Sequence, residues 1–266
     1  MEEKNIAIMY DFDDTLAPGN MQEHLFIPLL DMKPEEFWNE VDDFKIKNNM
    51  DNTLACMYMM FRKAKERDVS IKRESFAKYG EGIEFFDGVE EWFDRINEYG
   101  KRNGVNVHHY VISSGLKEII EGTKIANKFD KIYASSFLYN IDNIVKWPAT
   151  AVNYTNKTQF IFRLNKGILE VSDDRVNDYM SDEDKPLPFE NMIYIGDGMT
   201  DVPCMKIVKE FKGHSIAIHH DEKSRETAID LLRHNRVNYV AQADYTTNSE
   251  LDVYVKEIID RIADGR

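Results

Sequence analysis

Hydrophobic residues along this chain form two kinds of pattern, short apolar runs and longer stretches with helical spacing. The run from Ile6 to Tyr10 ends in acidic residues, which is typical of a buried parallel strand. Comparable runs predict strands at residues 107–112, 131–134, 192–195, 215–218 and 239–241. Helical spacing predicts helices at residues 89–99, 115–120, 158–166 and 249–262. Strands that alternate with helices indicate an α/β fold with a doubly wound parallel sheet, covered on both faces.

A long helical segment lies between the first two predicted strands. From about residue 20 to residue 79 apolar residues recur at helical spacing, and no convincing strand interrupts them. This segment is much longer than one crossover between parallel strands requires. We therefore predict a separate helical cap domain formed by residues 19–85, and a core domain formed by residues 1–18 and 86–266.

In two further segments the hydrophobic residues show no clear strand or helix periodicity. Residues 137–154 fit either a loop or a hairpin. Residues 172–185 are rich in Asp and Glu, and we expect them to form an exposed insertion. The two cysteines, Cys56 and Cys204, are too few for a disulfide framework, so we expect buried thiols.

Composition and charge limit the classes of partner. Hydrophobic residues make up 42% of the chain and aromatic residues 12%, as in a globular protein. The formal net charge of −14 argues against nucleic acid or an anionic membrane surface as partner, because both need a basic face. The chain shows neither a secretory signal nor a run approaching the ~20 apolar residues that span a bilayer. We expect a cytoplasmic protein, and nothing in the sequence indicates its oligomeric state.

Candidate chemistry begins where the first predicted strand ends, since doubly wound sheets bind ligands at the carboxyl ends of their strands. Asp11 and Asp13 are two residues apart, so an extended backbone directs both side chains the same way. Two such carboxylates repel unless a cation or a proton lies between them. A nucleophile and an acid/base beside a hard cation would resolve this conflict. The alternative is an acidic loop in which Asp14 or Thr15 caps a helix.

The second predicted strand ends in a run of small polar residues. Ser113, Ser114 and Gly115 follow it and are predicted to begin a helix. A hydroxyl and free backbone N–H groups at a helix start suit a phosphate oxygen. Serine and glycine are also ordinary capping residues, which is the alternative for this run.

A second acidic motif follows the predicted strand at 192–195. Asp197 and Asp201 lie in a glycine-containing turn and can face Asp11. Magnesium favours one or two carboxylates together with waters and a phosphate oxygen, although a simple Asp-Gly turn would also explain the motif. Lys157 begins the preceding helix, where its charge could neutralise a nucleophile and a phosphoryl group. Lys166, near the end of that helix, is a competing candidate.

In this order, the motifs resemble the four signature motifs of the haloacid dehalogenase superfamily, over the whole chain except the acidic insertion. The sequence looks most like the phosphoserine phosphatase group, because it has DFDDTL as the first motif, a helical insert directly after it, SSG as the second and GDGMTD as the fourth. The resemblance implies a Rossmann-like core with a helical C1-type cap. It also implies a Mg²⁺-dependent phosphatase that hydrolyses a small phosphate monoester through an aspartyl-phosphate.

The resemblance also implies roles for single residues. Asp11 would be the nucleophile, Asp13 the general acid/base and Lys157 the motif lysine. The implied phosphate-binding residues are Thr15, Ser113, Ser114, Gly115 and Lys157. The implied metal site comprises Asp11, Asp13 through its backbone carbonyl, Asp197 and the adjacent Asp201.

Substrate preference is predicted from the residue nine positions beyond the nucleophile. Phosphoserine phosphatases typically carry a glutamate there, which receives the substrate's ammonium. Here the residue is Asn20, whose amide supplies no countercharge. We therefore expect no preference for phosphoserine, although Glu23 and His24 follow closely and could take over this role. A larger or less cationic leaving group would meet a cap lined from Phe26, Met57, Tyr58 and Phe61.

Three alternatives share parts of this pattern. A phosphotransferase or nucleotidase of the same superfamily would carry every motif. A non-catalytic binding or regulatory protein would use a degenerate version of the fold. A receiver-type phosphoacceptor also uses an aspartate and magnesium, but it is usually built without a helical cap.

Overall fold

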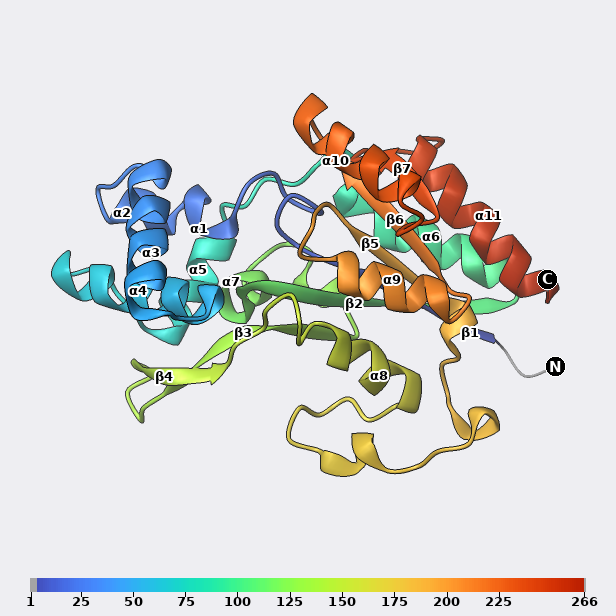
Figure 1. The fold of residues 1–266 in the computed structure, drawn as a ribbon, viewed down its shortest axis with the longest axis horizontal. Coiled ribbons are helices and arrows are strands. Elements are labelled where there is room, and N and C mark those ends of the chain that lie inside the picture. The colour runs from blue at the N-terminus through green and yellow to red at the C-terminus, as the bar shows by residue number, and fades with distance from the viewer. Residues whose placement is uncertain (1–3, 266) are drawn as a thin grey trace.

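The computed structural model describes residues 4–265, which form one seven-stranded sheet with the order β4-β3-β2-β1-β5-β6-β7 (Figure 1). The strands are β1 (Lys4–Tyr10), β2 (Val105–Leu116), β3 (Lys131–Tyr139), β4 (Val145–Thr150), β5 (Met192–Gly196), β6 (His214–His219) and β7 (Tyr239–Gln242). All neighbouring strands are parallel except β3 and β4, which are antiparallel. The predicted α/β fold with a doubly wound parallel sheet is confirmed, and β1 lies at its centre.

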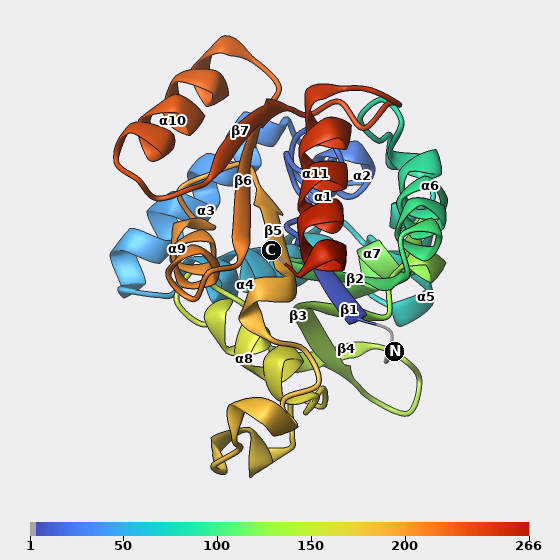
Figure 2. The same cartoon turned by 90° about the vertical axis from the view of Figure 1, so that its right-hand side faces the viewer.

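Different helices cover the two faces of the sheet, because successive side chains of a strand point to opposite sides. In β1, Ile8 belongs to one hydrophobic core and Met9 to the other. The helices of the Ile8 core include α6 (Val89–Arg102), α7 (Lys117–Glu121) and α11 (Glu250–Asp264), and the same core extends into the helices at residues 21–80. Those of the Met9 core are α8 (Thr158–Lys166), α9 (Val202–Glu210) and α10 (Glu222–Arg233). Figure 2 shows the two groups on either side of the strands.

The helical segment at residues 21–80, between β1 and α6, lies at one end of the molecule (Figure 1). Its helices are α1 (Met21–His24), α2 (Phe26–Leu29), α3 (Pro34–Asn48), α4 (Asn52–Glu66) and α5 (Arg73–Gly80). Helix α5 contacts α7 so closely that a Cβ atom at Gly122 would lie 1.7 Å from the carbonyl oxygen of Ala77. A glycine is therefore required at this contact. The division into a core and a cap domain stays a prediction.

Two local predictions are refined by the structure. The segment 137–154 is a hairpin rather than a loop, because β3 continues to Tyr139 and pairs with β4. The helix predicted from residue 115 is wrong at its start. Strand β2 continues through Leu116, which pairs with Ser135 of β3, so that α7 begins only at Lys117. Neighbouring strands extend β2 beyond what local propensity indicated.

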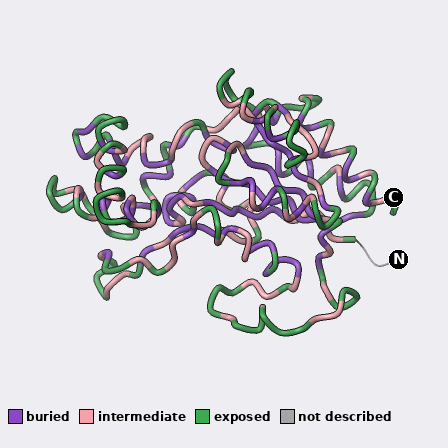
Figure 3. Tube along the Cα trace, in the orientation of Figure 1, coloured by how far each residue is buried: buried purple, intermediate pink, exposed green. Residues whose placement is uncertain are grey.

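The acidic segment 172–185 is mostly exposed, as predicted (Figure 3). The short 3₁₀ helices are η1 (Ala126–Lys128), η2 (Asp174–Asn177), η3 (Asp182–Asp184) and η4 (Phe189–Asn191). The Lys166 Nζ atom donates hydrogen bonds to the carbonyl oxygens of Val176 and Asp178, at 2.8 and 2.5 Å.

Of the two cysteines, Cys204 is buried as predicted, whereas Cys56 is half-buried.

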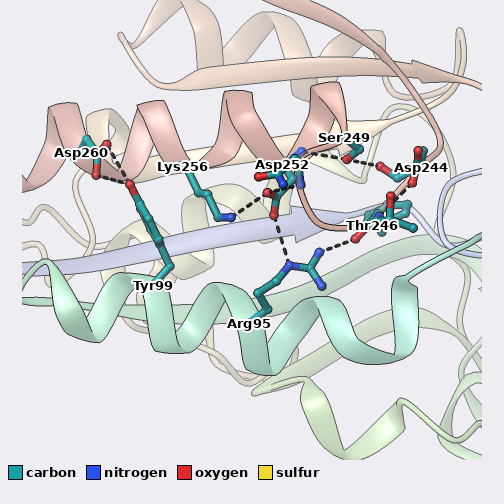
Figure 4. Close-up of polar contacts among 10 residues, drawn as sticks. Arg95, Tyr99, Asp244, Thr246, Ser249, Asp252, Lys256 and Asp260 are labelled. Atoms are coloured by element: carbon teal, nitrogen blue, oxygen red, sulfur yellow. Dashed lines mark hydrogen bonds and ion pairs between the residues drawn. The ribbon is translucent and has the colours of Figure 1, made fainter.

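A buried polar cluster joins α11 to α6 (Figure 4). The Asp252 carboxylate accepts hydrogen bonds from Arg95 Nε at 3.2 Å and Lys256 Nζ at 2.7 Å. Arg95 also donates to the backbone carbonyl of Tyr245. The Tyr245 hydroxyl in turn donates to the carbonyl oxygen of Thr15 at 2.9 Å. The cluster therefore connects the C-terminal helix to the loop that follows β1.

We expect Asp252→Asn to lower the free energy of unfolding by about 2 kcal/mol at pH 7, because charge-assisted hydrogen bonds to a buried group are lost. Burial alone would raise the pKa of Asp252, but hydrogen bonds from Lys256, the Asn248 backbone and Arg95 bring it below its ordinary value. The stabilisation is therefore complete at a pH above about 3.9, the pKa of the Asp252 carboxyl in the unfolded protein. It disappears as the pH falls through the lower pKa that this carboxyl has in the folded protein.

Urea unfolding at pH 7 and at progressively lower pH measures this effect. The difference from wild type should shrink below about pH 4. Asp43→Asn, an exposed position on α3, is the matched control and should have little effect at either pH. An equal loss of stability by the Asp252 variant at all pH values would contradict the assignment.

Candidate active site

Asp11 lies directly after the central strand, in contact with the neighbouring strand. Its backbone N–H donates to the carbonyl oxygen of Ile195 in β5 at 3.0 Å. Its carboxylate accepts a hydrogen bond from the Phe12 N–H at 2.8 Å and pairs with Lys157 Nζ at 2.8 Å. Burial and the Asp201 charge raise the pKa of Asp11 to about 6, although Lys157 opposes this shift. Asp11 is 7% exposed, so it is held tightly but remains reachable.

Lys157 is a fully buried cation between two carboxylates. Its Nζ atom lies 2.8 Å from Asp11 Oδ2 and 2.8 Å from Asp201 Oδ1. Burial alone would lower the pKa of Lys157, but these two carboxylates raise it above its ordinary value, so the ammonium stays charged. Of the two candidate lysines, the structure places Lys157 at Asp11, whereas Lys166 binds backbone carbonyls of the acidic segment.

Asp197 and Asp201, on the loop after β5, bring further negative charge toward Asp11. One carboxylate oxygen from each of these three residues lies within 4.8 Å of the others. Asp201 Oδ2 is buried without a hydrogen-bond partner among the described residues, and a Cβ atom at Gly196 would lie 2.6 Å from it. Burial, followed by the Asp201 and Asp11 charges, raises the pKa of Asp197 to about 8. Three carboxylates facing one lysine fit a hard cation bound through oxygen.

The Asp13 carboxylate is not part of this group of three. Its Oδ1 atom accepts a hydrogen bond from the Met21 backbone N–H at 2.8 Å. Burial and the Asp11 charge raise the pKa of Asp13 well above its ordinary value, which favours the protonated form. The structure therefore does not bring the Asp13 carboxylate into the candidate metal site, and a role for its backbone carbonyl stays a prediction.

Two adjoining cavities meet at Asp13. The outer cavity, of about 240 Å³, is lined by Asp11, Asp13, Ser113, Asn153 and Asp197 among others. The inner cavity, of about 110 Å³, is lined mainly by residues of α1, α3, α4 and the end of β2. Residues common to both linings are Asp13, Asn20, Asn52, Thr53 and Ser114. A group bound at Asp11 in the outer cavity would therefore have the inner cavity next to it, across these shared residues.

The residues predicted to bind phosphate take different positions. Ser113 and Ser114 line the outer cavity with Asp11. The Ser113 hydroxyl oxygen accepts the Gly115 N–H at 3.0 Å, so this N–H is not free for phosphate as predicted, and Gly115 lines the inner cavity instead. Thr15 is fully buried outside both linings. The extension of β2 through Leu116 accounts for the changed position of Gly115.

Sequence reasoning missed the polar residues that close the outer cavity opposite Asp11. Asn153 donates from Nδ2 to Asp51 Oδ2 at 2.9 Å, and the Thr53 hydroxyl donates to the Val152 carbonyl at 3.0 Å. These bonds hold the start of α4 against the loop before α8. The Tyr194 hydroxyl was also missed, and it donates to Asp201 Oδ1 at 2.7 Å. Capping residues and a tyrosine in an apolar strand give no distinctive local signal.

The candidate specificity residues Asn20, Glu23 and His24 occupy different positions relative to the two cavities. Asn20 lines both cavities and donates from Nδ2 to Glu23 Oε1 at 2.6 Å. Glu23 lies outside both linings, and the His24 ring contacts the Pro18 carbonyl at 2.9 Å, also outside them. Of the expected cap lining, Met57 faces the inner cavity. Phe26 and Phe61 pack in the hydrophobic core, and Tyr58 stacks on Phe44 near the surface.

The fold and the site define an α/β enzyme with an acidic, cation-compatible centre at the carboxyl ends of its central strands. The family model of haloacid dehalogenase-like hydrolases matches residues 8–206. The chain belongs to this family and is a hydrolase.

One sequence relative and two solved structures resemble this chain over most of its length. An uncharacterized protein from Borreliella burgdorferi is 29% identical over 284 aligned residues, which cover 97% of each chain. A haloacid dehalogenase family hydrolase from Salmonella enterica serovar Typhi has a similar structure, with a TM-score of 0.60 and 16% identity over 95% of this chain and 70% of that one. A phosphoserine phosphatase, solved as an analogue of its phospho-aspartyl intermediate, has a TM-score of 0.57 and 16% identity over 96% and 99% of the two chains. These structural likenesses show the fold.

Across residues 4–265, no helix has the length and apolar character needed to cross a membrane.

Proposed function

We propose that this hydrolase is a magnesium-dependent phosphatase that cleaves a small phosphate monoester through an aspartyl-phosphate on Asp11. The observation that carries the proposal is the contact of Asp11 with the buried Lys157, beside two further carboxylates that can share a cation. A carboxylate can attack a phosphate dianion only where positive charge screens their repulsion. The likeness in fold to a phosphoserine phosphatase supports the same chemistry.

Asp11, Asp197 and the Asp13 carbonyl would hold the magnesium ion, which supplies Lewis-acid screening of negative charge when bound. The Asp11 carboxylate attacks phosphorus in line, and the bond from phosphorus to the ester oxygen breaks. Protonated Asp13 gives its proton to the departing alcohol. Water then attacks the acyl phosphate and loses a proton to Asp13, which releases inorganic phosphate and restores both aspartates.

Lys157 and Ser113 would position the phosphoryl oxygens during both steps. The Lys157 ammonium already contacts Asp11, so an oxygen of the transferred group comes within its reach. The Ser113 oxygen accepts the Gly115 N–H, which leaves the hydroxyl hydrogen free to donate toward the outer cavity. Electrostatic stabilisation of these oxygens supplies most of the catalysis in phosphoryl transfer.

Phosphate release from a panel of alkyl and aryl phosphate monoesters tests the proposed function. We expect turnover with magnesium, complete loss of turnover in EDTA and recovery when magnesium is returned. The reason is that Asp11, Asp197 and Asp201 converge with only Lys157 to balance them. Full activity in EDTA would refute the metal requirement. No activity toward any ester would refute the phosphatase assignment.

A second test separates the role of Asp13 from that of Asp11. We expect Asp13→Asn to slow the phosphorylation step by roughly 10²–10⁴-fold for alkyl phosphates, because the alcohol then leaves without a proton. An activated aryl phosphate needs little protonation and should lose much less. Single-turnover measurements compare the two substrates, and equal losses would exclude Asp13 as the proton donor.

A further inference from the structure

The inner cavity is lined by Asp13, which donates a proton to the leaving alcohol if the proposed function holds. Five of its lining residues carry the argument: Asn20, Gln22, Trp38, Met57 and Met60. Asp13 forms the boundary with the outer cavity, where Asp11 lies. An ester oxygen protonated by Asp13 would therefore direct its carbon skeleton into the inner cavity.

Gln22 presents an unused hydrogen-bonding group to this cavity. The residue lies in α1 and is 5% exposed, and its Oε1 atom is buried without a hydrogen-bond partner among the described residues. Buried polar atoms are nearly always paired, either within the protein or with water or a ligand. Because Gln22 lines the cavity, a bound molecule can supply the missing partner. The amide can be turned by half a rotation, so it can accept or donate such a bond.

The same wall offers no free charge to a charged alcohol. Of the residues that the structure describes, no lysine or arginine lines the inner cavity, and Asp13 is the only acidic residue in its lining. Glu23 lies behind the wall, where its Oε1 atom accepts both the Asn20 Nδ2 bond at 2.6 Å and the Trp38 Nε1 bond at 2.6 Å. Both donors are thereby fixed in the cavity wall, and the Glu23 carboxylate is already hydrogen-bonded to them.

Apolar contact is supplied from α4. The thioether side chains of Met57 and Met60 line the cavity beside the Trp38 ring. They suit a carbon skeleton but cannot satisfy an ammonium or a carboxylate, which is costly to bury without a partner. The cavity thus combines apolar walls with the uncharged amides of Asn20 and Gln22.

We infer that the inner cavity binds the alcohol portion of the substrate and that Gln22 selects an uncharged alcohol with a second hydroxyl group. The substrate class is accordingly a small polyol phosphate, rather than a phosphorylated amine, amino acid or carboxylic acid. This inference rests on the proposed function. Gln22 acts as a specificity residue through a hydrogen bond to that second hydroxyl.

The first test compares kcat/KM of the wild-type enzyme for esters of similar size. We expect glycerol phosphate to exceed propyl phosphate, phosphoethanolamine, phosphoserine and phosphoglycolate by about tenfold or more, since a buried hydrogen-bonding site rejects ligands that leave it unpaired. Preference for any of these other esters would overturn the inference. Turnover of p-nitrophenyl phosphate, measured alongside, shows whether the phosphatase function itself stands.

Variants of Gln22 provide the second test. Gln22→Met should lower kcat/KM about tenfold or more for glycerol phosphate but leave propyl phosphate nearly unchanged, because only the former loses a hydrogen bond. Gln22→Glu should shift the ratio of phosphoethanolamine to glycerol phosphate upward by about tenfold or more, since it adds a countercharge. Gln242→Glu, at an exposed position in β7, is the matched control and should not change this ratio.

Equal losses for glycerol phosphate and propyl phosphate in the Gln22→Met variant would overturn the inference, because a general packing defect has that effect. An unchanged substrate ratio in Gln22→Glu would also overturn it. Thermal unfolding identifies a variant that fails to fold. In that case the comparison of kcat/KM among the esters, made with the wild-type enzyme, decides whether the inference holds. Absence of turnover toward every ester, including p-nitrophenyl phosphate, would defeat the proposed function and this inference with it.

Discussion

Asp11→Asn should lower phosphate release by at least about four orders of magnitude, as expected when a covalent nucleophile is removed. An amide has nearly the size of the carboxylate and can still accept the Phe12 N–H bond. It cannot attack phosphorus, because its oxygen carries no full negative charge. Lys157 keeps its second partner, Asp201, so the local structure should survive.

The same substitution should not weaken the fold in the absence of metal. The pKa of Asp11 is raised to about 6, chiefly by burial and Asp201, and so lies above its unfolded value of about 3.9. A group whose folded pKa is raised in this way costs stability increasingly as the pH rises between these two values. The variant lacks that cost. We therefore expect its melting temperature at pH 8, in EDTA, to equal or exceed that of wild type.

Mass spectrometry after rapid acid quench gives the direct measurement. A phosphorylated peptide containing residue 11 should form in the wild type and be absent from Asp11→Asn. Asp43→Asn serves as the matched control on an exposed helix position. Substantial turnover by the Asp11 variant, with the amide at residue 11 verified by mass, would exclude Asp11 as the nucleophile.

Lys157→Ala should lower kcat by about 10³-fold, because it removes a buried cation that contacts both Asp11 and Asp201. Without it the two carboxylates face each other with only a metal ion to screen them. The loss should therefore appear in turnover at saturating magnesium as well as at low magnesium. Circular dichroism at both concentrations shows whether the fold is retained.

Lys166→Ala is the matched control on the same helix. Lys166 contacts the carbonyl oxygens of Val176 and Asp178, which are far from the Asp11 loop in the sequence. We therefore expect the kcat of the Lys166→Ala variant to stay within about twofold of wild type. The reverse ranking of the two variants would show that the motif lysine had been misassigned.

Local sequence signals were sufficient for the main features of the fold. Apolar runs such as Ile6 to Tyr10 predict strands because burial on both faces demands hydrophobic residues at every position. The acids at the ends of β1 and β5 follow from the same pattern, since they come where the buried run stops. Parallel pairing then brings these strand ends to one edge, which is why Asp11 and Asp197 could be grouped before any contact was known.

Other features depend on partners distant in the chain, and only the tertiary structure decided them. Local sequence could not choose between Lys157 and Lys166, because the choice depends on which Nζ atom reaches Asp11 across 146 residues of chain. Strand β2 passes its predicted end because β3 supplies a pairing partner for Leu116. The unpaired amide oxygen of Gln22 can be recognised only once the helices enclose it. Propensity acts between neighbouring residues, whereas pairing, burial and charge compensation are set by the packed fold.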